Sequence, residues 1–434
     1  MVIHNAQTHR LVRLDLRAWE LIAGADGTRD LDALLLAAAR IGAYRRASEV
    51  LTLLRQLHDL DLLADGLEPP KAPEGNVIPD ERPIVALDGF VISCDLGGRC
   101  CGQYPSIGFE PHAVVRARAL LPDVLEAGAR PDRVFLPLAG AVGSGGSSAA
   151  PMIDGRCAYL GVGTVENACG IHAKGGLDAK PLGCRIYPTT LVDDGREIRA
   201  SVKIECGCVL RSLEMPNGSP IVPGNARTRG ELDRGIEIRA LPPIVVVSGQ
   251  SMPVATESLS AWSREVAAAK VADALAATWA LADAVENDGL ALHVSVAAME
   301  STVRPPLDEL RVRLGALATR ARAGATSASE WRSEGDWTRT ARGSVAAALE
   351  ALARSPTTLE AALAPTEPSV AREEAFYLRA SIFGHHLIAD LPLCEALRDR
   401  TMRLLVARAL PNFGGGPQAI AMAEAVFRTA SLSR

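Results

Sequence analysis

Eight of the chain's nine cysteines lie between positions 94 and 208 of its 434 residues. These eight are Cys94, Cys100, Cys101, Cys157, Cys169, Cys184, Cys206 and Cys208. Ordinary buried cysteines would not gather in about a quarter of a sequence, and a reducing cytoplasm does not maintain structural disulfides. The clustering therefore predicts a metal centre held by thiolates.

The composition favours a mostly helical protein of the cytoplasm. Aromatic residues make up only 4% of the chain, so its cores depend on Leu, Val and Ala, which suit helices better than sheets. The first residues, MVIHNAQTHR, show no basic region followed by an apolar one, and no run of about 18 apolar residues follows. We therefore expect a cytoplasmic location and no membrane partner. A formal net charge of -5 argues against nucleic-acid binding.

The first 67 residues are predicted to form a small docking unit. Apolar residues recur there at near-helical spacing, and a helix is expected over residues 47–60, with Ser48 at its N-cap region. Residues 68–83, EPPKAPEGNVIPDERP, hold five prolines. Such a segment builds neither a helix nor a central strand, so it is expected to be a linker.

Residues 84–253 are predicted to form a metal-binding domain. The segment ERPIVALDGFVISC carries short β-type runs that lead into the first cysteine, so loops at strand ends are expected to carry ligands. Apolar spacing predicts a helix over residues 111–126. Residues 140–151 are expected to be a flexible connection, because Gly143 and Gly145 lack the other residues of a phosphate-binding loop.

Residues 254–434 are predicted to form a helical C-terminal domain. The segment IVVVSG beyond Pro242 is strand-like, and residues 256–353 and 373–409 have helical spacing. The expected fold class is α+β and predominantly helical. It combines a winged-helix-like N-terminal unit, an irregular cysteine-rich core with short strands, and the helical C-terminal domain.

The spacing of the cysteines limits how they could share metal ions. In extended chain, neighbouring side chains point to opposite sides, so Cys100 and Cys101 do not suit one ion, whereas Cys206 and Cys208 would share a face. Two or more metal atoms are implied. Eight thiolates satisfy two zincs, two iron–sulfur clusters, or one cluster with spare thiols, and spacing does not choose among them. Sulfur ligands favour zinc, iron–sulfur or copper(I) over hard cations.

The motifs CDLGGRCC, CAYL, CGIH and KPLGCRIYP resemble, in this order, the blocks of a cysteine-cluster family with a zinc- or iron-chelating domain. In the last motif the matching positions are Pro181, Cys184, Arg185, Tyr187 and Pro188. Gly97 departs from the pattern, since many members carry a second cysteine there. The later ECGC segment, with Cys206 and Cys208, is similar to one in longer members and could replace that ligand.

The longer members include the flagellin lysine N-methylases, and the order of cysteine blocks, LPPIVVV segment and helical tail is similar to theirs. This resemblance implies an iron–sulfur cluster and lysine N-methylation with S-adenosylmethionine. Residues 10–66 resemble the winged-helix peptide-binding domain of pyrroloquinoline quinone biosynthesis. That likeness implies docking of a peptide or protein substrate ahead of interdomain packing or DNA binding.

Two further residues are candidates for cofactor binding. His172 follows Cys169 by three residues, and Arg185 is next to Cys184. Without binding the metal themselves, both side chains could donate hydrogen bonds to the thiolates that do. The alternative for His172 is packing in the protein interior, and the alternative for Arg185 is a solvated position on the surface.

Other polar groups are predicted to be structural. His385 and His386 are expected to be core or surface histidines, and Asp193 and Asp194 to form a hairpin turn. The chain has no Gly-x-Ser-x-Gly or His-Glu-x-x-His motif, and no catalytic residue is identified. The sequence thus predicts an iron–sulfur protein that modifies a protein or peptide side chain. The alternative is a non-catalytic zinc-binding structural or interaction protein.

Overall fold

Two compact units make up the chain, Met1–Asp80 and Glu81–Arg434. The computed structural model describes residues 2–4, 11–13, 81–94, 98, 107–124, 135–137, 148–153, 156–161, 168–215, 217–232, 236, 238–242, 244–248, 253–327, 336–388, 391–410 and 416–429. In the first unit, strands β1 (Val2–His4) and β2 (Leu11–Arg13) pair antiparallel. The predicted helix over residues 47–60, the rest of the winged-helix-like unit, and nearly all of the predicted linker lie outside the described residues.

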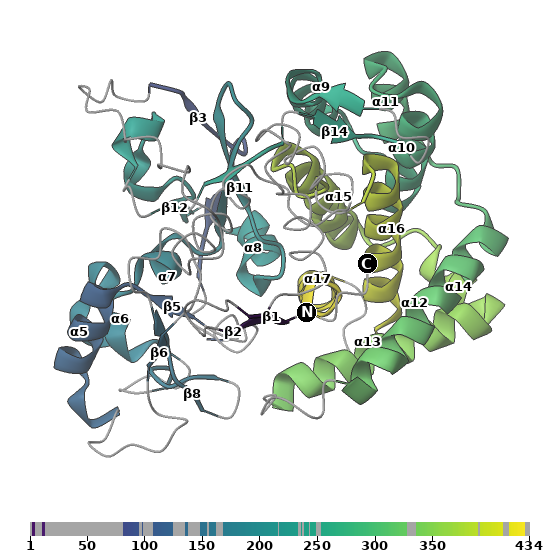
Figure 1. The fold of residues 1–434 in the computed structure, drawn as a ribbon. Coiled ribbons are helices and arrows are strands. Elements are labelled where there is room, and N and C mark those ends of the chain that lie inside the picture. The colour runs from purple at the N-terminus through teal and green to yellow at the C-terminus, as the bar shows by residue number, and fades with distance from the viewer. Residues whose placement is uncertain are drawn as a thin grey trace. The chain divides into compact units, whose positions relative to one another are not determined.

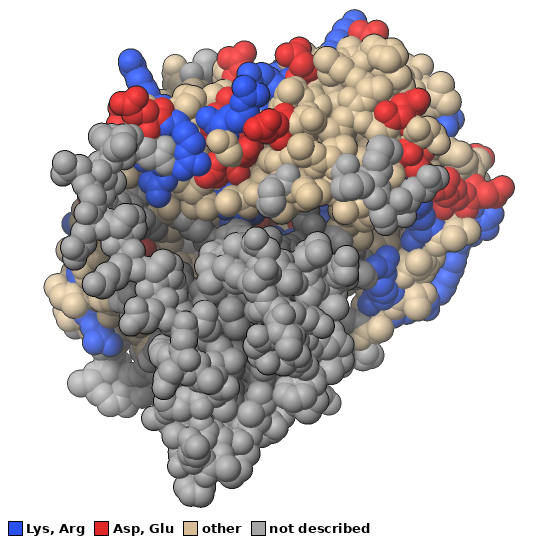
Figure 2. Space-filling model, turned by 45° about the horizontal axis from the view of Figure 1, so that its top comes forward, with Lys and Arg blue, Asp and Glu red and all other residues tan. Residues whose placement is uncertain are grey.

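The chain is predominantly helical with short strands, which confirms the expected fold class at this level. Figure 1 shows the longer helices of the second unit together on the right, with β14 beside α9 and α10, and most of its other strands and short helices on the left. Among the helices that the structure describes, none is long and apolar enough to cross a lipid bilayer. On the face shown in Figure 2, acidic and basic side chains of the described residues are interspersed.

A β-hairpin is the centre of the larger sheet in the second unit. Strands β10 (Thr189–Asp193) and β11 (Ile198–Val202) pair antiparallel around a turn at Asp194 and Gly195, which confirms the predicted hairpin. Gly195 has a φ of 88°, a left-handed conformation that glycine adopts readily. Strands β13 (Arg239–Ala240) and β3 (Ile84–Ala86) add parallel to β10 and β11, respectively.

Both faces of β11 are covered. All five of its residues are buried, and successive side chains of a strand point to opposite faces. On one face Ile198, Ala200 and Val202 join the large hydrophobic core. On the other, Arg199 and Ser201 hydrogen-bond to the helices α9 (Thr256–Ala268) and α15 (Pro368–Phe383), respectively. The hairpin is therefore fixed from both sides.

The remaining strands are two or three residues long and form four small sheets. The pairs are β12 (Ser219–Pro220) with β4 (Val91–Ile92), β14 (Ile244–Val246) with β15 (Pro253–Ala255), and β8 (Met152–Ile153) with β9 (Arg156–Cys157), while β7 (Ser148–Ala149) lies between β5 (Gly108–Phe109) and β6 (Leu136–Pro137). The strand-like segments predicted before the first cysteine and beyond Pro242 are confirmed.

Four short helices accompany these strands. They are α5 (Pro111–Leu120), α6 (Gly170–Gly175), α7 (Leu182–Ile186) and α8 (Gly207–Arg211). The predicted helix over residues 111–126 is too long, because α5 ends at Leu120 and Pro122 cannot continue its hydrogen bonding. In the predicted connection over residues 140–151, Ser148 and Ala149 form β7, and Gly143 and Gly145 lie outside the described residues.

Nine helices, seven of them longer than α5, are described in the rest of the second unit, as the Ala-rich sequence predicts. They are α9 (Thr256–Ala268), α10 (Ala274–Asp288), α11 (Leu292–Met299), α12 (Leu307–Ser327), α13 (Asp336–Arg354), α14 (Pro356–Ala362), α15 (Pro368–Phe383), α16 (Leu393–Ala409) and α17 (Pro417–Thr429). Helix α10 begins where the Asp273 side chain accepts hydrogen bonds from the N–H groups of Leu275 and Ala276. It ends at Gly289, whose φ is 64°.

Two hydrophobic cores form the second unit. The large one extends from the β10–β11 hairpin through α17 and includes Cys206 and Cys208. The small one is built around Phe109, Tyr159 and Ile171 and includes Cys157. Cys157 thus belongs to a different packed region from Cys206 and Cys208.

Candidate metal centre

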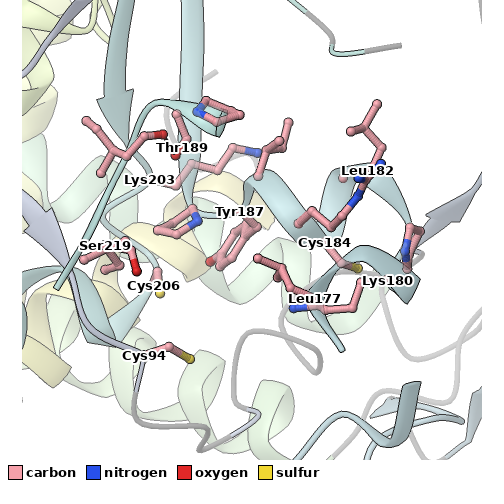
Figure 3. Close-up of a pocket in the computed structure, with 18 of the residues that line it drawn as sticks. Cys94, Leu177, Lys180, Leu182, Cys184, Tyr187, Thr189, Lys203, Cys206 and Ser219 are labelled. Atoms are coloured by element: carbon pink, nitrogen blue, oxygen red, sulfur yellow. Dashed lines mark hydrogen bonds between the residues drawn. The ribbon is translucent and has the colours of Figure 1, made fainter. Parts of the chain in front are cut away.

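Six of the eight clustered cysteines line one pocket of about 1180 Å³ in the second unit. They are Cys94, Cys157, Cys169, Cys184, Cys206 and Cys208. Figure 3 shows the sulfurs of Cys94 and Cys206 on one side of the Tyr187 ring and that of Cys184 on the other. Cys100 and Cys101 lie outside the described residues. The pocket therefore collects thiols from five separate segments of the chain.

Backbone pairing places Cys157 and Cys169 in the same wall of the pocket. Leu160 and Cys169 form an antiparallel bridge. The N–H of Gly170 donates to the carbonyl of Tyr159 at 2.8 Å. Cys157 ends β9 just before this bridge, and Cys169 is the N-cap residue of α6.

Helix α7 brings Cys184 to the same region. The N–H of Leu182, its first residue, donates to Oε2 of Glu110 at 3.2 Å. Glu110 lies between β5 and α5, so this bond ties the start of α7 to the small core. Leu182 itself packs into the large core. Cys184 thus stands on a helix that contacts both cores.

The Cys157, Cys169 and Cys184 thiols, called here the small-core thiols, affect one another electrostatically. Burial first, and then the neighbouring thiolates of Cys184 and Cys169, raise the pKa of Cys157 to about 12, against the lowering effect of a hydrogen bond from the Tyr159 backbone N–H. Negatively charged thiolates near one another repel, so their formation costs free energy unless a positive charge is close by. A bound metal ion supplies that charge and deprotonates its thiol ligands.

The Cys94, Cys206 and Cys208 side chains, called here the large-core thiols, are arranged around α8. Cys206 is the N-cap residue of this helix and Cys208 its second residue. The Ser212 hydroxyl donates to the carbonyl of Cys208 at 2.7 Å and accepts from the N–H of Ser93 at 2.9 Å. Cys94, which follows Ser93, is thereby held next to α8.

Positive side chains adjoin the thiols. Arg211 donates through Nη2 to Sγ of Cys208 at 3.6 Å, and its Nε donates to the carbonyl of Gly207 at 3.1 Å. Arg185 and the partly exposed His172 also line the pocket, as do Lys180 and Lys203. Cations in this position offset the negative charge of a thiolate-rich centre.

The donor atoms fit a soft metal, although their separation does not suit a single ion. No disulfide joins two of the seven cysteines that the structure describes. Among the residues that the structure describes, no three Cys, His, Asp or Glu side chains are close enough to hold one metal ion together. An iron–sulfur cluster spreads its ligand positions over a larger volume than one ion does.

One geometric expectation for the cysteines is wrong. Cys206 and Cys208 were expected to share a face of extended chain, but the chain turns into helix α8 at Gly207. On a helix, residues two apart do not face the same way. Both side chains nevertheless line the pocket, because Cys206 precedes the first turn and Cys208 lies within it. Cys94 lies in irregular chain two residues beyond β4, at a strand end as expected, whereas Cys169 and Cys206 lie at helix starts.

The residues predicted to be structural lie away from the pocket wall. Cys394 is fully buried in α16, and its N–H donates to the carbonyl of Val247 at 3.0 Å. His385 is also buried, and His386 Nε2 is 3.0 Å from the Thr190 hydroxyl. Asp194 accepts hydrogen bonds from the N–H groups of Arg196 and Glu197 in the turn.

Tyr159 and Arg211 are pocket residues that the sequence analysis did not single out. Tyr159 follows Cys157 by two residues, and Arg211 follows Cys208 by three, which is one helical turn. These short spacings from a cysteine are the sequence features that could have identified both residues as neighbours of the thiols. Comparison of the chain with protein-family models, with curated proteins and with solved structures found no match.

Proposed function

We propose that the chain is an iron–sulfur protein whose cysteine-lined pocket holds the cluster. The observation that carries this proposal is the convergence of six cysteines from both hydrophobic cores on one pocket. Sulfur donors favour iron–sulfur, zinc or copper(I), and the spread of the donors favours a cluster over a mononuclear site.

The cluster would also join the two cores. Among the described residues, nine are buried in the small core, too few to make its position secure by hydrophobic packing alone. Small-core thiols and large-core thiols on opposite sides of the pocket would be connected by the metal. Metal binding would then contribute directly to folding of this region.

We further propose that the pocket serves modification of a protein or peptide side chain. A volume of about 1180 Å³ exceeds the usual 300–1,000 Å³ of a small-molecule site, so an organic cosubstrate could fit beside a cluster. The resemblance to flagellin lysine N-methylases suggests S-adenosylmethionine as methyl donor and lysine as acceptor. In this proposal the winged-helix-like unit over residues 1–67 docks the substrate, and a cytoplasmic location suits the reduced thiols.

Analysis of anaerobically purified protein for iron, zinc and acid-labile sulfide tests the proposal. Iron and sulfide in comparable amounts, with a broad absorption band near about 400 nm, would support the cluster. A colourless protein with stoichiometric zinc would instead support the second candidate, in which zinc only holds the two cores together. Transfer of label from methyl-labelled S-adenosylmethionine to a lysine peptide tests the finer proposal.

A further inference from the structure

The Tyr159 hydroxyl is a buried polar group without a hydrogen-bond partner among the described residues. The side chain has no exposed surface, and its Oη is enclosed. Buried hydroxyls are almost always hydrogen-bonded, because their desolvation is otherwise uncompensated. The hydroxyl at this position therefore requires a hydrogen-bond partner that the described residues do not supply.

The position of this hydroxyl is fixed by its surroundings. The Tyr159 ring packs against Phe109 and Phe135, with ring centroids 5.9 and 6.2 Å away, and these two rings also contact each other. Its carbonyl accepts from the N–H of Gly170, and its own N–H donates to the sulfur of Cys157. Neither the ring nor the backbone can turn freely to find another acceptor.

Tyr159 lines the pocket together with all three small-core thiols. A second donor atom in this wall, Nε of Arg185, is also buried without a partner among the described residues. Both groups can donate a hydrogen bond, and the arginine can only donate. Two unused donors beside clustered thiols indicate that an acceptor-bearing, negatively charged group belongs there.

We infer that Tyr159 is a positioning residue that donates its hydroxyl hydrogen bond to a sulfur of the metal centre held by the small-core thiols. The inference rests on the proposed function, since the acceptor is the sulfide or thiolate of that centre. Hydrogen bonds to cluster sulfur stabilise the more negative, reduced form.

Thermal unfolding of Tyr159→Phe with and without the metal tests this role. The chelator-treated variant is expected to melt at or above the temperature of chelator-treated wild type, because an unsatisfied hydroxyl has been removed. After reconstitution with Fe²⁺ and sulfide the order should reverse. Tyr377→Phe is the matched control. Its hydroxyl donates to Glu424 in the helical part of the unit, so this variant should melt lower in both forms.

A redox titration provides the second measurement. The reconstituted Tyr159→Phe protein should keep its iron and sulfide content and show a more negative midpoint potential, whereas Tyr377→Phe should leave the potential unchanged. If Tyr159→Phe raised the melting temperature equally with and without metal, or left the midpoint potential unchanged, the inferred role of Tyr159 would be overturned. The proposed function would not be affected by that result. A wild type that takes up no iron under these conditions would overturn the proposed function and this inference together.

Discussion

The guanidinium of Arg199 lies against the carboxylate of Asp194, with Nε 3.3 Å from Oδ2, and neither side chain has any exposed surface. Arg199 also donates to Oε1 of Glu197 at 3.0 Å and to the carbonyl of Ser260 at 2.6 Å. Asp194 accepts from the Ser260 hydroxyl. This network joins the tip of the hairpin to helix α9, at the opposite end of the hairpin from Thr189 in the pocket wall.

Replacing Arg199 by Met should destabilise the second unit by about 3–5 kcal/mol, because two carboxylates would lose their buried partner. The control is Arg264→Met. Arg264 pairs with Glu197 at 2.6 Å, but its side chain is 55% exposed, so its loss should cost at most about 1 kcal/mol. Urea unfolding measures both values. Similar losses for the two variants would show that the buried network has no special role.

A buried carboxylate makes a pH-dependent contribution to stability. Burial first, and then the nearby carboxylate of Glu214, raise the pKa of Glu373 from 4.5 to about 7. The folded state therefore favours protonated Glu373. The contribution of this carboxyl group to the free energy of unfolding is fully present below pH 4.5 and is lost as the pH rises through about 7.

The Glu373→Gln variant should accordingly lose this dependence. Relative to wild type it should gain about 1–3 kcal/mol of unfolding free energy between pH 5 and pH 8. Urea unfolding at several pH values, with the exposed Glu214→Gln as a comparison, measures the difference. Parallel pH profiles for wild type and Glu373→Gln would contradict the shifted pKa.

Cysteine reactivity should follow burial in the metal-free protein. With a pKa of about 12, only about one Cys157 in 10⁴ is a thiolate at pH 8, so iodoacetamide should hardly modify it. Cys169 is partly exposed and should react faster. Peptide mass spectrometry reports both rates, and reconstitution with Fe²⁺ and sulfide should protect Cys169. Equal modification of the two in folded, metal-free protein would be inconsistent with the described packing.

Local sequence patterns predicted the elements that depend on local interactions. The apolar spacing that predicts α15 and α16 and the strand-like IVVVSG segment correspond to described elements. Strand β11 shows the limit of such patterns. Its alternation of Arg199 and Ser201 with apolar residues suggests a solvent-facing side, but α9 and α15 cover that side. No local signal reports which helices return to a strand.

The same limit applies to the candidate site. The density of cysteines predicted which residues would meet, and six of them do line one pocket. Their grouping depends on contacts between distant segments, such as the Leu160–Cys169 bridge and the bond from Leu182 to Glu110. Tyr159 could be recognised only after those contacts placed it in the pocket wall that also carries the small-core thiols.

Metal content of cysteine variants tests the central claim most directly. Iron and zinc are measured per chain in anaerobically purified wild type, Cys184→Ser, Cys206→Ser and Cys394→Ala. We expect the first two variants to lose most of the metal, because each removes a thiol from the pocket wall, and Cys394→Ala to retain the wild-type amount. Equal metal content in all four proteins, or a wild type without metal, would contradict a shared centre held by these cysteines.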